Sequence, residues 1–150
     1  MIYLISIVAL IVADQWSKYW AIGALMNQPS SEFIKGFLGF RYTENTGAAF
    51  SILRDQQLLL ILLTFLILAG MAGYLVKAIR TDAPIVVKIA FVFVIAGAIG
   101  NFIDRVRLNF VVDFLEFKFI DFPIFNIADV CVVVGVILLA FSTIFLKYDF

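Results

Sequence analysis

The stretch FNIADVCVVVGVILLAFSTIFL, residues 125–146, decides the fold class of this chain. A membrane-spanning helix needs about 20 predominantly apolar residues, and this stretch carries no charge beyond Asp129. Its beginning is nevertheless polar, because it contains Asn126 and Asp129. A carboxylate near hydrocarbon is costly, so Asp129 requires either a polar partner or a function.

The whole chain shares the apolar character of this stretch. Of its 150 residues, 64% are hydrophobic and only 15% are charged, whereas soluble domains are about 45–50% apolar. The composition therefore predicts an integral membrane protein with a single membrane domain over residues 1–150. The net charge of zero gives no sign of a nucleic-acid partner.

Apolar segments predict four membrane spans, at approximately 2–25, 58–76, 85–103 and 127–146. Residues 1–13 alone are too short to cross a bilayer, so the first helix must continue through Asp14 and Lys18. Both charges are therefore expected within the membrane. The small residues of AGAIG, 96–100, would allow the third span to approach a neighbouring helix closely.

Two long loops, 26–57 and 104–126, connect these spans on one side of the membrane, and a short turn, 77–84, lies on the other. The orientation of the chain follows from the distribution of Lys and Arg between the two sides. Their count favours, by a small margin, a cytoplasmic location for the long loops.

The first long loop contains two local patterns. FIKGFLGFRYTEN, at 33–45, alternates in part between aromatic and polar residues, as an extended surface segment does. NTGAAFSIL, at 45–53, predicts a short helix capped by Asn45 or Thr46. An extended segment followed by a short helix is therefore expected here.

The composition excludes several kinds of catalytic site. The chain has no His, which removes His-based triads, HExxH metalloprotease sites and imidazole proton relays. The single cysteine, Cys131, is interpreted as a small core residue rather than a nucleophile, because apolar surroundings disfavour a thiolate. No carboxylate spacing specifies a metal site, so neither a metal nor another cofactor is expected.

Two aspartates in apolar surroundings are the candidates for chemistry. Asp129 has a structural alternative, a capping-box arrangement with Asn126 at the start of the last span, and FNIAD alone does not decide between the two. Asp113 interrupts FVVDFLEF, and its structural alternative is a buried ion pair with Arg105 or Arg107. Two such carboxylates on one side of the membrane suggest a shared site.

Carboxylates that lie close together cannot both ionise easily, so one of them holds a proton and the other does not. Such a pair can activate water and protonate a carbonyl oxygen or a leaving amine, which is the chemistry of aspartic proteases. Asp113 and Asp129 would titrate as a unit.

Further polar residues lie within the spans or at their ends. In GAIGNFIDRVR, Asn101 and Asp104 share a helix face, and Asn101 and Arg105 are four residues apart, where they could face a substrate backbone or a headgroup. An end-of-helix polar network is the structural alternative for Asp104. Asp14 and Lys18 are also four residues apart and are interpreted chiefly as an intramembrane ion pair that fixes the first helix.

A different class of function also fits these residues. A small proton-coupled transporter could use Asp14, Asp113 and Asp129 as proton carriers. It would need a polar path through the whole bilayer, yet the second and fourth spans are nearly devoid of charge. A purely structural four-helix scaffold would leave the clustering of polar residues unexplained.

Five motifs, in this order and spacing, resemble those of the bacterial lipoprotein signal peptidases, or signal peptidase II. They are DQWSK at 14–18, NTGAAFS at 45–51, GNFIDR at 100–105, VVDF at 111–114 and FNIAD at 125–129. The resemblance covers nearly the whole chain. It implies an all-α polytopic membrane protein, with four transmembrane helices, a small extracytoplasmic β-like platform and a short helix.

The same resemblance implies a membrane aspartic endopeptidase with Asp113 and Asp129 as its catalytic pair. Its substrate would be a prolipoprotein whose cysteine already carries diacylglyceryl, cut just before that cysteine. The residues implied to bind substrate or support the site are Asn45, Gly47, Asn101, Arg105, Asn126, Asp14, Lys18 and Asp104.

The resemblance also implies a location and partners. The enzyme would lie in the bacterial cytoplasmic (inner) membrane, with both termini cytoplasmic and the long loops outside. We prefer this orientation to the opposite one, which the nearly balanced count of Lys and Arg favours by a small margin. The partners expected are the lipid-modified prolipoprotein and membrane lipids, and the chain is expected to be a monomer.

Overall fold

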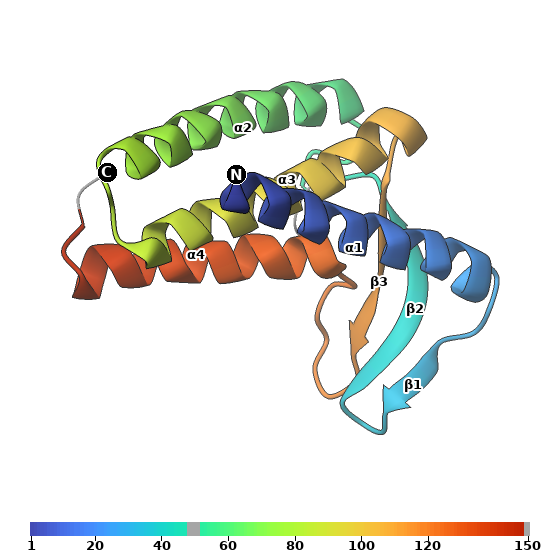
Figure 1. The fold of residues 1–150 in the computed structure, drawn as a ribbon. Coiled ribbons are helices and arrows are strands. Elements are labelled where there is room, and N and C mark those ends of the chain that lie inside the picture. Colours follow the sequence, from blue (N-terminus) through green and yellow to red (C-terminus); the bar gives the residue numbers. More distant parts are fainter. Residues whose placement is uncertain (48–51, 149–150) are drawn as a thin grey trace.

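The computed structural model describes residues 1–47 and 52–148 (Figure 1). Four long helices and a small sheet make up this part of the chain. Their order is α1 (Ile2–Leu25), β1 (Ser31–Ile34), β2 (Leu38–Asn45), α2 (Gln57–Arg80), α3 (Ile85–Leu108), β3 (Val111–Phe117) and α4 (Ile127–Phe145). All four helices are long and apolar enough to cross a membrane. Together with the three strands they confirm the predicted fold class.

Helix α3 lies at the centre of the bundle and packs against α1, α2 and α4 (Figure 1). Its buried side chains run along its whole length, from Val87 to Arg105. By contrast, the side chains of α2 are mostly exposed, as expected of a helix whose outer surface faces lipid. The central helix is therefore the one that can present polar residues to its neighbours away from lipid.

Small residues bring α3 and α4 into close contact, as the AGAIG motif predicts. A Cβ atom on Gly97 would collide with the carbonyl oxygen of Ala128, and one on Gly135 would lie 2.5 Å from Val94. A Cβ on Gly100 would lie 2.5 Å from the carboxylate of Asp14. Glycine at these positions lets the backbones approach, so that the start of α4 lies against α3 and α1.

The three strands form an antiparallel sheet in the order β1-β2-β3. The sheet lies at the end of the bundle where α1 ends and α4 begins (Figure 1). Val112 and Phe114 of β3 are buried against Ala21 of α1, which fixes the sheet on the bundle. The segment FIKGFLGFRYTEN, predicted to be extended, supplies part of β1 and all of β2.

The structure differs from the sequence interpretation at three places. Helix α2 continues to Arg80, so residues 77–80 of the expected turn are helical. Helix α3 continues to Leu108, five residues beyond the predicted span, and ends at Asn109 in the left-handed conformation with φ 64°. Asp104 and Arg105 therefore belong to its last turns and not to a loop. Of the short helix expected at 45–53, Asn45 belongs to β2 and residues 52–53 lie in a turn, whereas residues 48–51 lie outside the described residues.

Candidate active site

Asn126 precedes helix α4 and caps it. Its side-chain oxygen accepts a hydrogen bond from the backbone N–H of Asp129 at 2.9 Å, and its own backbone N–H donates to Asp129 Oδ2 at 3.1 Å. These two bonds form a complete capping box, the structural alternative considered for Asp129. The box fixes both the start of α4 and the direction of the Asp129 carboxylate.

The same asparagine also binds the other candidate carboxylate. Asn126 is fully buried, and its Nδ2 donates to Asp113 Oδ1 at 2.6 Å and to Asn101 Oδ1 at 3.1 Å. One residue thus joins Asp113 and Asp129, which are 16 positions apart in the sequence. The capping box and the carboxylate pair are parts of one arrangement and not alternatives to one another.

Asp113 lies on β3 opposite Thr43 of β2 and is almost completely buried. Its second oxygen accepts a hydrogen bond from Asn45 Nδ2 at 3.0 Å. Burial, together with the negative charge of Asp129 nearby, raises the pKa of Asp113 to about 7, although the two asparagine hydrogen bonds oppose the shift. This carboxyl group can therefore keep a proton near neutral pH.

The ion pair considered for Asp113 is not formed. Within residues 1–47 and 52–148, neither Arg105 nor Arg107 makes a salt bridge to it. Arg105 instead donates to the backbone oxygen of Gly47 at 2.9 Å. Gly47 in turn donates its N–H to the side chain of Asn45 at 2.9 Å, so Arg105 supports the loop that presents Asn45.

Asp129 differs from Asp113 in its accessibility. It is only partly buried, whereas Asp113 is 2% exposed. Its Oδ1 accepts a hydrogen bond from Asn101 Nδ2 at 2.8 Å. One member of the pair is thus shielded and the other can be reached by water or by a substrate.

A buried cation, the ammonium of Lys18, belongs to the network that binds Asp113 and Asp129. The ammonium of Lys18 is 3.0 Å from Asp14 and 3.0 Å from Asp104, and it donates to Asn101 Oδ1 at 2.8 Å. The ion pair expected between Asp14 and Lys18 is therefore present, and Asp104 extends it to a second carboxylate. Lys18 is 2% exposed, so little solvent screens these charges.

The carboxylates around Lys18 also hold the backbone at both ends of the site. Asp14 Oδ1 accepts the N–H of Ala128, in the first turn of α4, at 2.9 Å. Asp104 Oδ2 accepts the N–H of Val112, the residue before Asp113, at 3.1 Å. The network thereby fixes α4 and β3, the two elements that carry the candidate pair.

Sequence reasoning missed one member of this network. Gln15 Nε2 donates to Asp104 Oδ1 at 2.9 Å, to the backbone oxygen of Gly100 at 3.1 Å and to Asp14 Oδ2 at 3.2 Å. It lies three residues before Lys18 and so shares a helix face with it. This spacing and its polarity within an apolar helix were the available signals.

The structure brings all ten predicted site residues into one network of contacts. Two of them are the candidate aspartates, Asp113 and Asp129. The other eight bind these two side chains or hold the backbone around them: Asn45, Gly47, Asn101, Arg105, Asn126, Asp14, Lys18 and Asp104. Among the described residues, no group of three or more acidic or cysteine side chains has a metal-binding arrangement. Chemically, two neighbouring carboxyl groups, one of which can keep a proton near neutral pH, suit general acid–base catalysis.

Comparison with known proteins gives a consistent result. Residues 6–145 match the family model of signal peptidase (SPase) II. The chain is 42% identical over 135 residues to a lipoprotein signal peptidase of Streptococcus thermophilus (strain CNRZ 1066), covering 90% of this chain and 87% of the relative. It is 39% identical over 140 residues to the lipoprotein signal peptidase of Streptococcus pyogenes serotype M5, covering 92% and 90%.

Two solved structures have the same fold. Both are described as bacterial membrane enzymes determined by the in meso method, at 2.3 and 1.9 Å resolution. The first has a TM-score of 0.82 at 34% identity and covers 99% of this chain and 92% of its own. The second has a TM-score of 0.83 at 35% identity, with coverages of 95% and 92%.

The role of Lys18 as a support can be tested by comparing two variants. Lys18→Met leaves Asp14 and Asp104 buried without their cation, and removing one partner of a buried ion pair costs about 3–5 kcal/mol. Asp14→Asn leaves Lys18 paired with Asp104, so its effect on stability should be smaller. Melting curves in detergent should therefore show a larger loss for Lys18→Met. Equal melting temperatures for Lys18→Met and the unmodified protein would contradict the supporting role.

Proposed function

The chain belongs to the signal peptidase II family, and on that premise we propose that Asp113 and Asp129 are the catalytic pair of an aspartic endopeptidase. The protein is a peptidase that cleaves the signal peptides of prolipoproteins, and it is a multi-pass protein of the bacterial inner membrane. The observation that carries the aspartic mechanism is the binding of both carboxylates by Asn126.

The two aspartates have different roles in this mechanism. Asp113, shielded and with its pKa raised, holds the shared proton, and the more accessible Asp129 accepts a proton from the attacking water. The water oxygen bonds to the scissile carbonyl carbon while Asp113 gives its proton to the carbonyl oxygen. The C–N bond then breaks as the proton held by Asp129 passes to the leaving nitrogen, and Asp113 regains a proton from the tetrahedral intermediate.

The position of the pair fits a lipid-anchored substrate. Asp129 lies in the first turn of α4, at the boundary between the apolar helix and the sheet. A prolipoprotein whose cysteine carries diacylglyceryl would hold its scissile bond near this depth, because the acyl chains remain in the leaflet. We therefore assign cleavage to the bond just before the lipid-modified cysteine.

We further propose that the sheet end of the bundle faces outward and that both termini are cytoplasmic. The substrate's mature part lies outside the cell, so the pair must be accessible from that side. The ten proposed site residues all come from one chain, and their hydrogen bonds connect both aspartates. A monomer is therefore sufficient for activity.

The transporter alternative gains no support. The buried charges of α1 and the last turns of α3 gather at the sheet end of the bundle. Of the charges buried in the described residues, only Lys88 lies near the other end, where it pairs with Asp82 at 2.9 Å. A proton crossing the membrane would need carriers between these two groups.

The catalytic pair is tested by single and double substitutions. Asp113→Asn and Asp129→Asn should each lower signal-peptide release by about 10²–10⁴-fold, because general acid–base catalysis contributes this much. The double variant should be little worse than either single one, because the two groups act as a unit. The measurement is cleavage of a diacylglyceryl-modified prolipoprotein by each purified protein, with a melting curve to verify folding.

Asp55→Asn serves as the matched control for these variants. Its carboxylate is 75% exposed and lies outside the network, so cleavage should be unchanged. If a folded Asp113→Asn or Asp129→Asn protein kept more than about a tenth of the activity, that aspartate would be neither the acid nor the base, because tenfold corresponds to only ~1.4 kcal/mol of barrier.

The proposed orientation is tested by labelling from outside the cell. In a Cys131→Ala background, a cysteine replacing Lys35, between β1 and β2, should react with a membrane-impermeant reagent. A cysteine replacing Arg80, at the end of α2, should react only after the membrane is opened. The reverse pattern of labelling would place the site on the cytoplasmic side and overturn the proposed orientation.

A further inference from the structure

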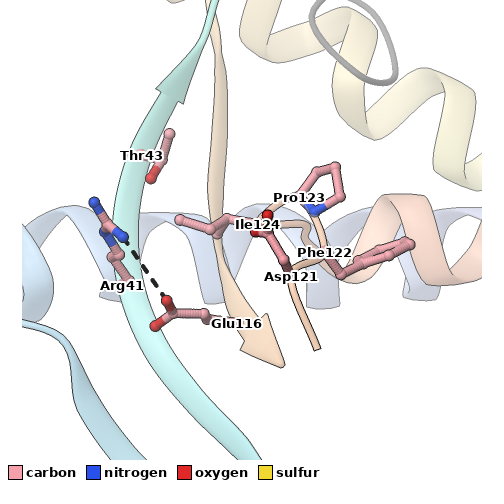
Figure 2. A pocket seen from close by; sticks show the side chains of 7 residues that line it. All are labelled: Arg41, Thr43, Glu116, Asp121, Phe122, Pro123 and Ile124. Carbon is pink, nitrogen blue, oxygen red and sulfur yellow. Dashed lines mark ion pairs between the residues drawn. The ribbon is translucent and has the colours of Figure 1, made fainter. Parts of the chain in front are cut away.

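A cleft of about 560 Å³ opens on the sheet, outside the network around the aspartates (Figure 2). Arg41 and Thr43 of β2 and Glu116 of β3 form one wall. The other wall is the segment 121–124, which connects the sheet to α4. None of these residues has a role in the proposed catalytic steps.

The strand register places one end of this cleft beside Asp113. Thr43 is the cross-strand partner of Asp113, and the segment 121–124 ends two residues before Asn126. Arg41 lies two residues from Thr43, and Glu116 lies three residues from Asp113, in the direction of the sheet's far end. At about 3.3 Å per residue, the Cα atoms of these residues lie on the order of 7–10 Å along the sheet from that of Asp113.

The charges in the cleft are not equally available to a ligand. Glu116 lies 3.8 Å from Arg41 and 2.5 Å from Lys118, so two cations already neutralise it. The hydrogen bond from Lys118 also holds the pKa of Glu116 below its usual value. Asp121 is exposed and makes no salt bridge within the described residues, which leaves its carboxylate available to a cationic group.

We propose that this cleft binds the second and third residues of the mature prolipoprotein chain and that Asp121 favours a basic side chain there. The inference rests on the proposed function, which places the scissile bond at Asp113 and Asp129. The chain leaving that bond is extended, and two to three residues cover the same roughly 7–10 Å. Residues just after the lipid-modified cysteine therefore reach the level of Arg41, Glu116 and Asp121.

The chemistry of the cleft favours a peptide over an acyl chain. Of its seven lining residues, Arg41, Glu116 and Asp121 are charged and Thr43 adds a hydroxyl group, whereas the remaining three, in segment 122–124, are apolar. Hydrocarbon placed against these groups would desolvate them without replacing their hydrogen bonds. A polypeptide supplies both amide hydrogen-bonding groups and polar side chains.

The test uses two diacylglyceryl-modified prolipoprotein peptides that differ only at the third residue of the mature part, Lys or Glu. The unmodified enzyme should cut the Lys peptide with a kcat/KM about two- to fivefold higher, as an exposed ion pair allows. The difference should lie in KM, because Asp121 does not touch the scissile bond. Asp121→Asn should bring the ratio close to one, and Asp121→Lys should invert it.

Asp55→Asn removes a carboxylate from the same side of the membrane but outside the cleft, so it should keep the original ratio. A Lys-to-Glu ratio of one in the unmodified enzyme, or a ratio unchanged in both Asp121 variants, would overturn the inference. A failure of the proposed function would give a different result, because Asp113→Asn or Asp129→Asn enzyme would then still cut both peptides.

Discussion

The hydrogen bonds of Asn126 to two carboxylates are the interaction on which the rest of the structure depends. Bringing Asp113 and Asp129 together in a shielded place is unfavourable unless their charge is reduced and their oxygens are hydrogen-bonded. Asn126 donates to one aspartate through its side chain and to the other through its backbone. Asn45 and Asn101 bind the remaining oxygens, and neutral amides do so without removing the pair's ability to hold a proton.

The buried ion network explains why the bundle can carry this pair. Lys18 neutralises part of the charge of Asp14 and Asp104, and these two carboxylates bind backbone N–H groups of α4 and β3. Glycines on α3 and α4 let the helices approach closely enough for these short bonds to form. Packing of small residues, a buried cation and fixed backbone groups thus act together to position the proposed catalytic residues.

Much of this arrangement could be predicted from the sequence. The features that could not be predicted depend on contacts between distant parts of the chain. Apolar length identifies the helices, and helical spacing identifies the Asp14–Lys18 pair, because both are local properties of the chain. The choice between a capping box and a shared site at Asp129 could not be made locally, since Asn126 serves both and Asp113 reaches it only through β3. Gln15 and the cleft lined by the segment 121–124 depend on contacts between elements, which carry no sequence period.

The central claim is that Asp113 and Asp129 share one catalytic proton, and the pH dependence of kcat/KM for signal-peptide release tests it most directly. Activity should fall in acid, where both carboxyl groups are protonated and no base remains. It should fall again as pH rises through about 7, because Asp113, with its pKa raised to about 7, then loses the proton it must donate. A rate that stayed constant or increased from about pH 6 to about pH 9, in enzyme that remained folded, would contradict the shared proton.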